Sequence, residues 1–129
     1  MKIQYKKTDG GRTKEGFGTE VRDCGVRALA CAAKISYSDA HDLAIYSGRK
    51  NRRRFNADQL YDDLGYQQVF TCNYRDKKPI TVKTAIEKYP KGRYILRISR
   101  HVFAVINGRI HDKTPIGLKA RVLNIWIIK

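Results

Sequence analysis

The sequence predicts an α+β fold, in which N-terminal helices pack on a C-terminal antiparallel sheet. In the first part of the chain, apolar residues recur at the three-and-four spacing of helices that bury one face. Towards the C-terminus, short runs of β-branched and aromatic residues follow one another, and Asn107-Gly108 is typical of a two-residue hairpin turn. With 129 residues the chain has the length of one domain, so we expect a single domain over 1–129.

The first expected elements are a strand, a loop and a helix with almost no polar face. Ile3 and Tyr5 alternate with polar residues, which indicates a strand over 2–7, and the flanking lysines favour an edge position in the sheet. Turn-forming glycines then indicate a loop as far as Thr19. From Asp23 the apolar spacing predicts a helix that neighbours cover on several sides, so we expect it to be the central helix.

Capping residues and stop signals delimit three further helices, and β-forming residues delimit a strand between the second and the third. These elements cover residues 39–46, 57–64, 67–74 and 82–89. The remaining elements are strands, of which the last is apolar on both faces and is therefore expected inside the sheet. The strands cover residues 94–98, 101–106, 109–112 and 122–128.

The chain is strongly basic, with 27 Lys and Arg against 12 Asp and Glu, a formal net charge of +15. Such a charge attracts polyanions, so nucleic acid or an acidic protein is a plausible partner. The densest cluster supplies the candidate anion-binding residues Arg49, Lys50, Arg52, Arg53 and Arg54. A solvated loop remains the alternative, since no aromatic residue that could stack on a base is interleaved with the cluster.

Neither a membrane-spanning run nor a signal peptide is recognisable, so we expect a soluble protein of the cytoplasm that does not bind membranes. The three cysteines are irregularly spaced and form no C-x-x-C motif. This pattern favours free thiols over a disulfide framework or a zinc site. We expect neither a metal nor a cofactor.

Cys24 stands where the central helix begins. Unpaired backbone N–H groups and the positive end of the helix dipole stabilise a thiolate there, and Arg22 and Arg27 add positive charge nearby. Cys24 is thus a candidate nucleophile. The alternative is a small buried apolar side chain, which is the usual role of a free cysteine.

A histidine that could activate this thiol is found in the predicted hairpin. If Asn107 and Gly108 form its loop, Asp112 lies on the same face as His101 and diagonally opposite it, within reach of a hydrogen bond, whereas His111 points to the other face. A carboxylate that orients a histidine, together with a thiol, is the arrangement that covalent acyl chemistry needs. Alternatively His101 is an ordinary surface residue and Asp112 starts a turn.

The motifs resemble those of the papain-like cysteine peptidase superfamily. Asp-Cys-Gly begins an Ala-rich helix at Asp23, and far downstream a strand opens with His101 and leads to Asn-Gly-x-x-x-Asp. Over about residues 20 to 115 the chain is similar to bacteriocin-leader peptidases of ABC exporters and to NlpC-type cell-wall endopeptidases, and it also resembles small phage-encoded proteins. The resemblance implies a papain-like fold and, for a phage protein, action in the host cytoplasm.

Carried over to this chain, the resemblance implies that Cys24 is the nucleophile, His101 the general base and Asp112 the residue that orients the histidine. The NlpC class commonly uses a second histidine as the third member, and His111 is close to that position. The superfamily also places a Gln oxyanion donor shortly before the cysteine, but this chain has Gly-Thr-Glu there. The backbone N–H of Cys24 and a second donor, for which Thr19 is the candidate, remain for the oxyanion site.

Two functions follow as expectations. The first is a cysteine-dependent hydrolase or acyl transferase that acts on a peptide or isopeptide amide, with an acidic peptide or protein as substrate. The second is a non-catalytic basic protein of the same fold that binds nucleic acid or an acidic host protein. The missing Gln and the +15 charge favour the second.

Overall fold

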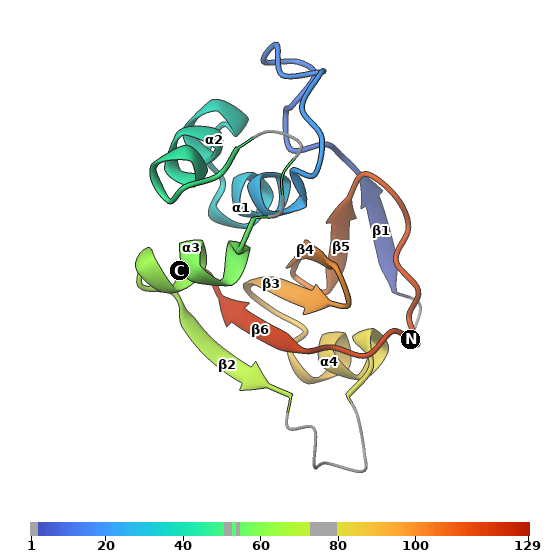
Figure 1. The fold of residues 1–129 in the computed structure, drawn as a ribbon. Coiled ribbons are helices and arrows are strands. Elements are labelled where there is room, and N and C mark those ends of the chain that lie inside the picture. The colour runs from blue at the N-terminus through green and yellow to red at the C-terminus, as the bar shows by residue number, and fades with distance from the viewer. Residues whose placement is uncertain (1–2, 51–52, 54, 73–79) are drawn as a thin grey trace.

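A computed structural model describes residues 3–50, 53, 55–72 and 80–129. Over these residues it is a mixed α+β fold with four helices and an open, mixed sheet of six strands (Figure 1). The helices are α1 (Cys24–Ala33), α2 (Tyr37–Tyr46), α3 (Ala57–Asp63) and α4 (Val82–Lys88). The strands are β1 (Gln4–Lys7), β2 (Gln67–Thr71), β3 (Arg93–Ile98), β4 (His101–Ile106), β5 (Arg109–Asp112) and β6 (Asn124–Ile127).

The strands lie in the order β1-β5-β4-β3-β6-β2. The expected edge position of β1 and interior position of β6 are confirmed. The prediction of a purely antiparallel, C-terminal sheet is wrong, because β1 pairs with β5 in parallel. The two strands are far apart in the sequence, so no turn between them sets their relative direction. Tyr5 on β1 donates its hydroxyl to the backbone carbonyl of Asp112 on β5, which is 107 positions away.

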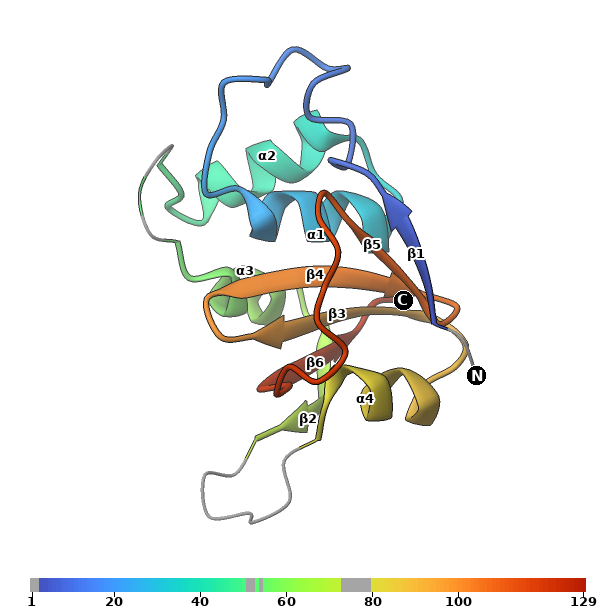
Figure 2. The same ribbon diagram turned by 90° about the vertical axis from the view of Figure 1, so that its right-hand side faces the viewer.

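The two faces of the sheet bury separate apolar clusters. Along β4, Val102 and Ala104 point into a cluster with α1, α2 and α3, whereas Phe103 and Val105 point into a cluster with α4. Figure 2 shows α1 and α2 on one side of the sheet and α4 on the other. The sheet is therefore the middle layer, and α1 lies directly over β4.

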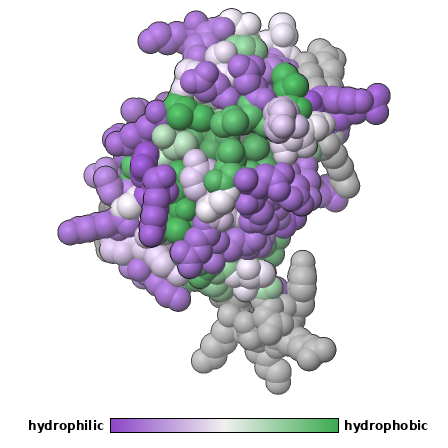
Figure 3. Space-filling model, turned by 90° about the vertical axis from the view of Figure 1, so that its left-hand side faces the viewer, coloured by the Kyte–Doolittle hydropathy of each residue, from purple (hydrophilic) through white to green (hydrophobic). Residues whose placement is uncertain are grey.

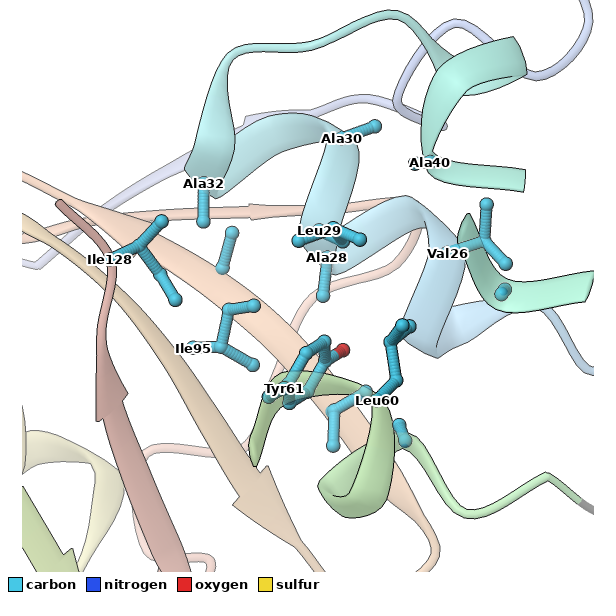
Figure 4. Packing of buried hydrophobic residues seen from close by; sticks show 14 of the residues in the cluster. Val26, Ala28, Leu29, Ala30, Ala32, Ala40, Leu60, Tyr61, Ile95 and Ile128 are labelled. Atoms are coloured by element: carbon cyan, nitrogen blue, oxygen red, sulfur yellow. The ribbon is translucent and has the colours of Figure 1, made fainter. Parts of the chain in front are cut away.

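Helix α1 is central, as its sequence predicts. Its Val26, Leu29 and Ala32 have no exposed surface. Figure 4 shows Ala40 of α2 on one side of this helix and Tyr61 and Ile95 on the other. The closeness of this packing explains the small residues on α1, because short side chains allow neighbouring backbones to approach.

Local hydrogen bonds set the element ends. The Ser36 hydroxyl accepts the N–H of Asp39, and the Glu15 carboxylate accepts those of Tyr37 and Ser38, so α2 begins at Tyr37, two residues before the predicted start. The side chains of Asn56 and Thr81 cap α3 and α4 as expected. The predicted end of β2 at residues 73–74 lies outside the described residues, and β6 is shorter than the predicted strand 122–128.

The predicted hairpin turn is confirmed. Asn107 and Gly108 both have positive φ, 49° and 76°, as a two-residue turn of this type requires. The resulting register pairs Ile106 with Arg109 and Ala104 with His111. This register fixes where Asp112 lies relative to the start of β4.

The surface over α2 and α3 is partly apolar. Figure 3 shows hydrophobic side chains in the middle of this face, bordered by hydrophilic ones. On α2, Leu43, Ile45 and Tyr46 are exposed. Across the residues that could be searched, no helix is long and apolar enough to cross a membrane.

Candidate active site

Cys24 is the first residue of α1, and the helix start around it is unusual. Asp23 occupies the N-cap position, yet its side chain makes no capping hydrogen bond. The N–H groups of the first helical turn therefore keep their donor capacity next to the thiol. Cys24 itself is partly buried against the apolar cluster of α1.

His101 is the first residue of β4 and follows the tight Ser99-Arg100 turn that connects β3 to β4. Its Nε2 atom lies 2.5 Å from Oδ2 of Asp112, the last residue of β5. The hydrogen bond that the hairpin register predicts between these residues is thus present. Because Asp112 engages Nε2, the Nδ1 atom is the ring nitrogen that remains for another partner.

Cys24 and His101 interact and shift each other's pKa. Burial raises the pKa of the Cys24 thiol, but the hydrogen bonds with the His101 side chain and the Val102 backbone, and the charges of His101 and Arg27, outweigh burial and lower it. For His101, burial lowers the pKa, while hydrogen bonds and charge interactions with Asp112 and Cys24 raise it to about 9. The two shifts together favour a thiolate next to an imidazolium.

Arg27 connects this pair to the start of the helix. Its Nη1 atom lies 2.9 Å from Oδ1 of Asp112, and its Nε atom lies 3.1 Å from Oδ1 of Asp23. Asp23 is only 2% exposed and also accepts the Tyr37 hydroxyl on Oδ2 at 2.9 Å and Arg12 Nη1 on Oδ1 at 3.4 Å. These partners explain why the Asp23 carboxylate does not cap α1.

Thr19, the candidate oxyanion donor, is exposed on the loop before α1. None of the interactions identified for the described residues joins it to Cys24. The neighbouring Glu20 is instead buried, where its carboxylate contacts His41 Nε2 and lies 3.2 Å from Arg49 Nη1. This second ionic cluster anchors the segment that precedes Cys24.

Arg49 does not fit the predicted role of an exposed anion-binding side chain. Only 1% of its side chain is exposed, its Nη1 atom pairs with Glu20, and its Nη2 atom donates to the Val21 carbonyl. Of the other candidates, Lys50 and Arg53 are exposed. Arg52 and Arg54 lie outside the described residues.

Cys31, Cys72 and His111 have other surroundings and other partners than Cys24 and His101. Burial raises the pKa of the Cys31 thiol. The Cys72 sulfur accepts a hydrogen bond from Arg121 at 3.0 Å. Burial, Lys6 and Arg109 lower the pKa of His111. His101 interacts with both Cys24 and Asp112, and none of the interactions found for the described residues joins His111 to Cys24.

The sequence predicts the positive charge of Arg27 near Cys24, but sequence reasoning missed that Arg27 pairs with both Asp23 and Asp112. The only signal was Asp23 four residues before it, a spacing that places both side chains on one helix face. The partner Asp112 is 85 positions away and could not be inferred from that spacing. Among residues 3–50, 53, 55–72 and 80–129, no group of three or more potential metal ligands occurs.

Comparison with protein-family models, curated proteins and solved structures finds no match for this chain.

Proposed function

We propose that the protein is a cysteine-dependent hydrolase or acyl transferase with a Cys24-His101-Asp112 triad. The observations that carry this proposal are that His101 lowers the pKa of the Cys24 thiol and that Nε2 of the same imidazole lies 2.5 Å from the buried carboxylate of Asp112. Nucleophile, base and orienting group are the three parts that covalent acyl catalysis requires. The resemblance to papain-like peptidases, including small phage-encoded proteins, supports the same assignment.

The reaction starts from the thiolate and imidazolium. The Cys24 sulfur attacks the amide carbon, a C–S bond forms, and the carbonyl electron pair moves to oxygen. The C–N bond then breaks while His101 gives its proton to the leaving nitrogen, which leaves a thioester and a neutral imidazole. His101 next takes a proton from water, the water oxygen attacks the thioester, and cleavage of the C–S bond restores the thiolate.

An amine in place of water would make the second half an acyl transfer. Asp112 keeps its charge throughout and stabilises the imidazolium through Nε2. Because Asp112 engages Nε2, Nδ1 is the ring nitrogen that is left to serve the thiol.

Backbone groups supply the oxyanion site in this proposal. The N–H groups of the first turn of α1, beginning with that of Cys24, are not capped by Asp23. They are therefore free to donate to a negatively charged oxygen next to the thiol. A side-chain donor before the helix adds to this site only if the loop around Thr19 moves towards a bound substrate.

The charge around the thiol favours an acidic peptide or protein as the substrate. Arg22 lies two residues before Cys24, and Arg100 lies directly before His101. Both side chains belong to exposed residues, and neither makes a hydrogen bond or ion pair with another described residue. Both residues also have positive φ, 54° and 60°, a conformation that is costly for arginine. We assign these two residues to recognition of substrate carboxylates.

The proposal can be tested without knowledge of the natural substrate. The activated ester p-nitrophenyl acetate should give a burst of p-nitrophenolate and an acetyl group on Cys24, detected by peptide mass spectrometry. The burst should disappear in Cys24→Ala and persist in Cys31→Ala, a matched variant on the same helix. A burst of equal size in Cys24→Ala would refute the assignment.

A second candidate function is binding of nucleic acid without catalysis. It is favoured by the net charge of +15 and by the exposed positions of Lys50 and Arg53. Fluorescence anisotropy with a labelled DNA or RNA oligonucleotide tests it. Salt-sensitive binding that Cys24→Ala leaves unchanged and Lys50→Gln/Arg53→Gln weakens would support this function, and absence of binding at low salt would exclude it.

The three thiols are free, which suits a reducing compartment. In support of the same proposal, we assign the activity to the cytoplasm, or to the host cytoplasm for a phage-encoded protein.

A further inference from the structure

One guanidinium contacts two buried carboxylates that belong to different parts of the candidate site. Arg27 Nη1 lies 2.9 Å from Asp112 on β5, and Arg27 Nε lies 3.1 Å from Asp23 at the start of its own helix. The Arg27 side chain is 13% exposed, whereas those of the two aspartates are 2% and 4% exposed. Buried, charge-assisted hydrogen bonds of this kind are shorter and stronger than those between neutral groups.

The contact with Asp112 determines which carboxylate oxygen faces the histidine. Oδ1 accepts Arg27 Nη1 and, at 2.7 Å, the backbone N–H of Lys113, while Oδ2 faces His101 at 2.5 Å. Each oxygen therefore has its own partners, and the carboxylate is held in one orientation. Arg27 also provides the positive charge that an ionised carboxylate needs when it is buried.

The contact with Asp23 holds the start of the helix that carries the thiol. Tyr37 and Arg12 bind the same carboxylate, which keeps it turned away from the N–H groups of α1. Because Cys24 directly follows Asp23, the position of this carboxylate and that of the sulfur are coupled through the backbone. Arg27 thus contacts both sides of the Cys24-His101 pair.

We propose that Arg27 is a positioning residue, whose fork-shaped guanidinium fixes the carboxylate that orients His101 relative to the helix start that presents Cys24. This inference rests on the proposed function, since it assigns a role within the same site. Arginine suits this role because its planar guanidinium donates in two fixed directions, which the single ammonium group of lysine cannot do. Arg27 itself does not touch the reacting atoms.

The charged and titratable groups around the pair come from several elements. His101 and Asp112 lie on the sheet, and Arg27 lies with Cys24 on α1. The hydroxyl of Tyr61 from α3 donates to the Gly25 carbonyl, and its pKa is raised by burial and by Cys24. Because these groups interact with Cys24 or His101, the test keeps the full chain and changes one residue at a time.

The chain offers a matched control in Arg12. Its side chain is 11% exposed, close to the 13% of Arg27, and it also pairs with Asp23, but it has no contact with Asp112 among the interactions found in the described ranges. Arg27→Gln removes the contacts with both carboxylates, and Arg27→Lys removes the fork at constant charge. Arg12→Gln removes a cation at Asp23, together with a hydrogen bond to the Glu20 carbonyl, and leaves the partners of Asp112 in place.

The measurement is the rate of alkylation of Cys24 by iodoacetamide as a function of pH, with the fold of each variant checked by circular dichroism. Arg27→Gln should move the midpoint of the profile upwards by about one pH unit, which is about a tenfold loss of rate at pH 6. Arg27→Lys should move it in the same direction by less. Arg12→Gln removes one of several partners of Asp23 and none of Asp112, so it should move the midpoint much less than Arg27→Gln.

The outcomes distinguish this inference from the proposed function. If wild-type Cys24 shows no enhanced reactivity at low pH, the proposed function fails. If the wild type is reactive and Arg27→Gln has the same profile, only the positioning role of Arg27 is refuted. If Arg27→Gln does not fold, Arg27→Lys decides, because a profile identical to that of the wild type would show that charge alone suffices and would overturn the inference.

Discussion

Replacing Asp112 with asparagine removes the charge that His101 faces while it preserves the size of the side chain. The pKa of His101 is raised from 6.5 to about 9, against the opposing effect of burial, by Asp112 and Cys24. At about 1.4 kcal/mol per pH unit, this shift corresponds to a preference of about 3 kcal/mol for the imidazolium. We expect Asp112→Asn to lower the pKa of His101 by about one to two units, because the asparagine amide cannot supply the negative charge.

The same substitution should change how folding stability depends on pH. A raised pKa means that the contribution of His101 is fully present below 6.5 and is lost as the pH rises through about 9. The lowered pKa of Cys24 acts in the opposite direction, since its contribution is present above the ordinary thiol pKa of 9.0 and is lost as the pH falls through its value in the folded protein. The comparison therefore belongs in a Cys24→Ser background, where this opposing effect is absent.

Urea unfolding at pH 6 and pH 9 measures the difference. The free energy of unfolding of Cys24→Ser should fall between these two pH values by about 1 to 2 kcal/mol more than that of Cys24→Ser/Asp112→Asn. Titrating groups that Asp112 does not affect contribute equally to both proteins and cancel. Equal pH dependence in the two proteins, or an unchanged titration of His101 by NMR, would show that Asp112 does not stabilise the imidazolium.

Two further predictions concern packing and the acid side of the pH range. Gly25→Ala should lower the free energy of unfolding by about 1 to 3 kcal/mol, because its Cβ atom would stand 2.9 Å from the Cβ of Ala57. In a double-mutant cycle measured by thermal unfolding, Ala57→Gly should recover part of this loss. Purely additive effects of the two substitutions would contradict this contact. Lys6→Gln should raise the pKa of His111, which burial, Lys6 and Arg109 lower, and should thus reduce the loss of stability as the pH falls through 6.5. NMR titration of His111 checks this prediction, and an identical titration in both proteins would count against it.

The parts of the site that local chain geometry determines could be predicted from the sequence. Asn107-Gly108 sets the hairpin register, and the register with side-chain alternation places Asp112 next to His101. The capping roles of Asn56 and Thr81 are equally local. In these cases the interacting residues are close in sequence, or a turn of known geometry connects them.

Contacts between distant segments could not be predicted in this way. The parallel pairing of β1 with β5, and the burial of Arg49 against Glu20 at a separation of 29 positions, depend on the packing of the whole chain. A basic run is usually solvated, so nothing in its composition indicates that Arg49 turns inwards. The link from Arg27 to Asp112 was missed for the same reason, because it depends on α1 packing beside β5.

The central claim is that Cys24 is held as a thiolate by His101. The most direct test is alkylation by iodoacetamide at pH 6, with each modified cysteine identified by mass spectrometry and with Cys31 and Cys72 as internal references. We expect Cys24 to react faster than both other cysteines, and we expect His101→Ala to abolish this difference. Equal labelling of all three cysteines in the wild type, or selective labelling of Cys24 that survives His101→Ala, would contradict it.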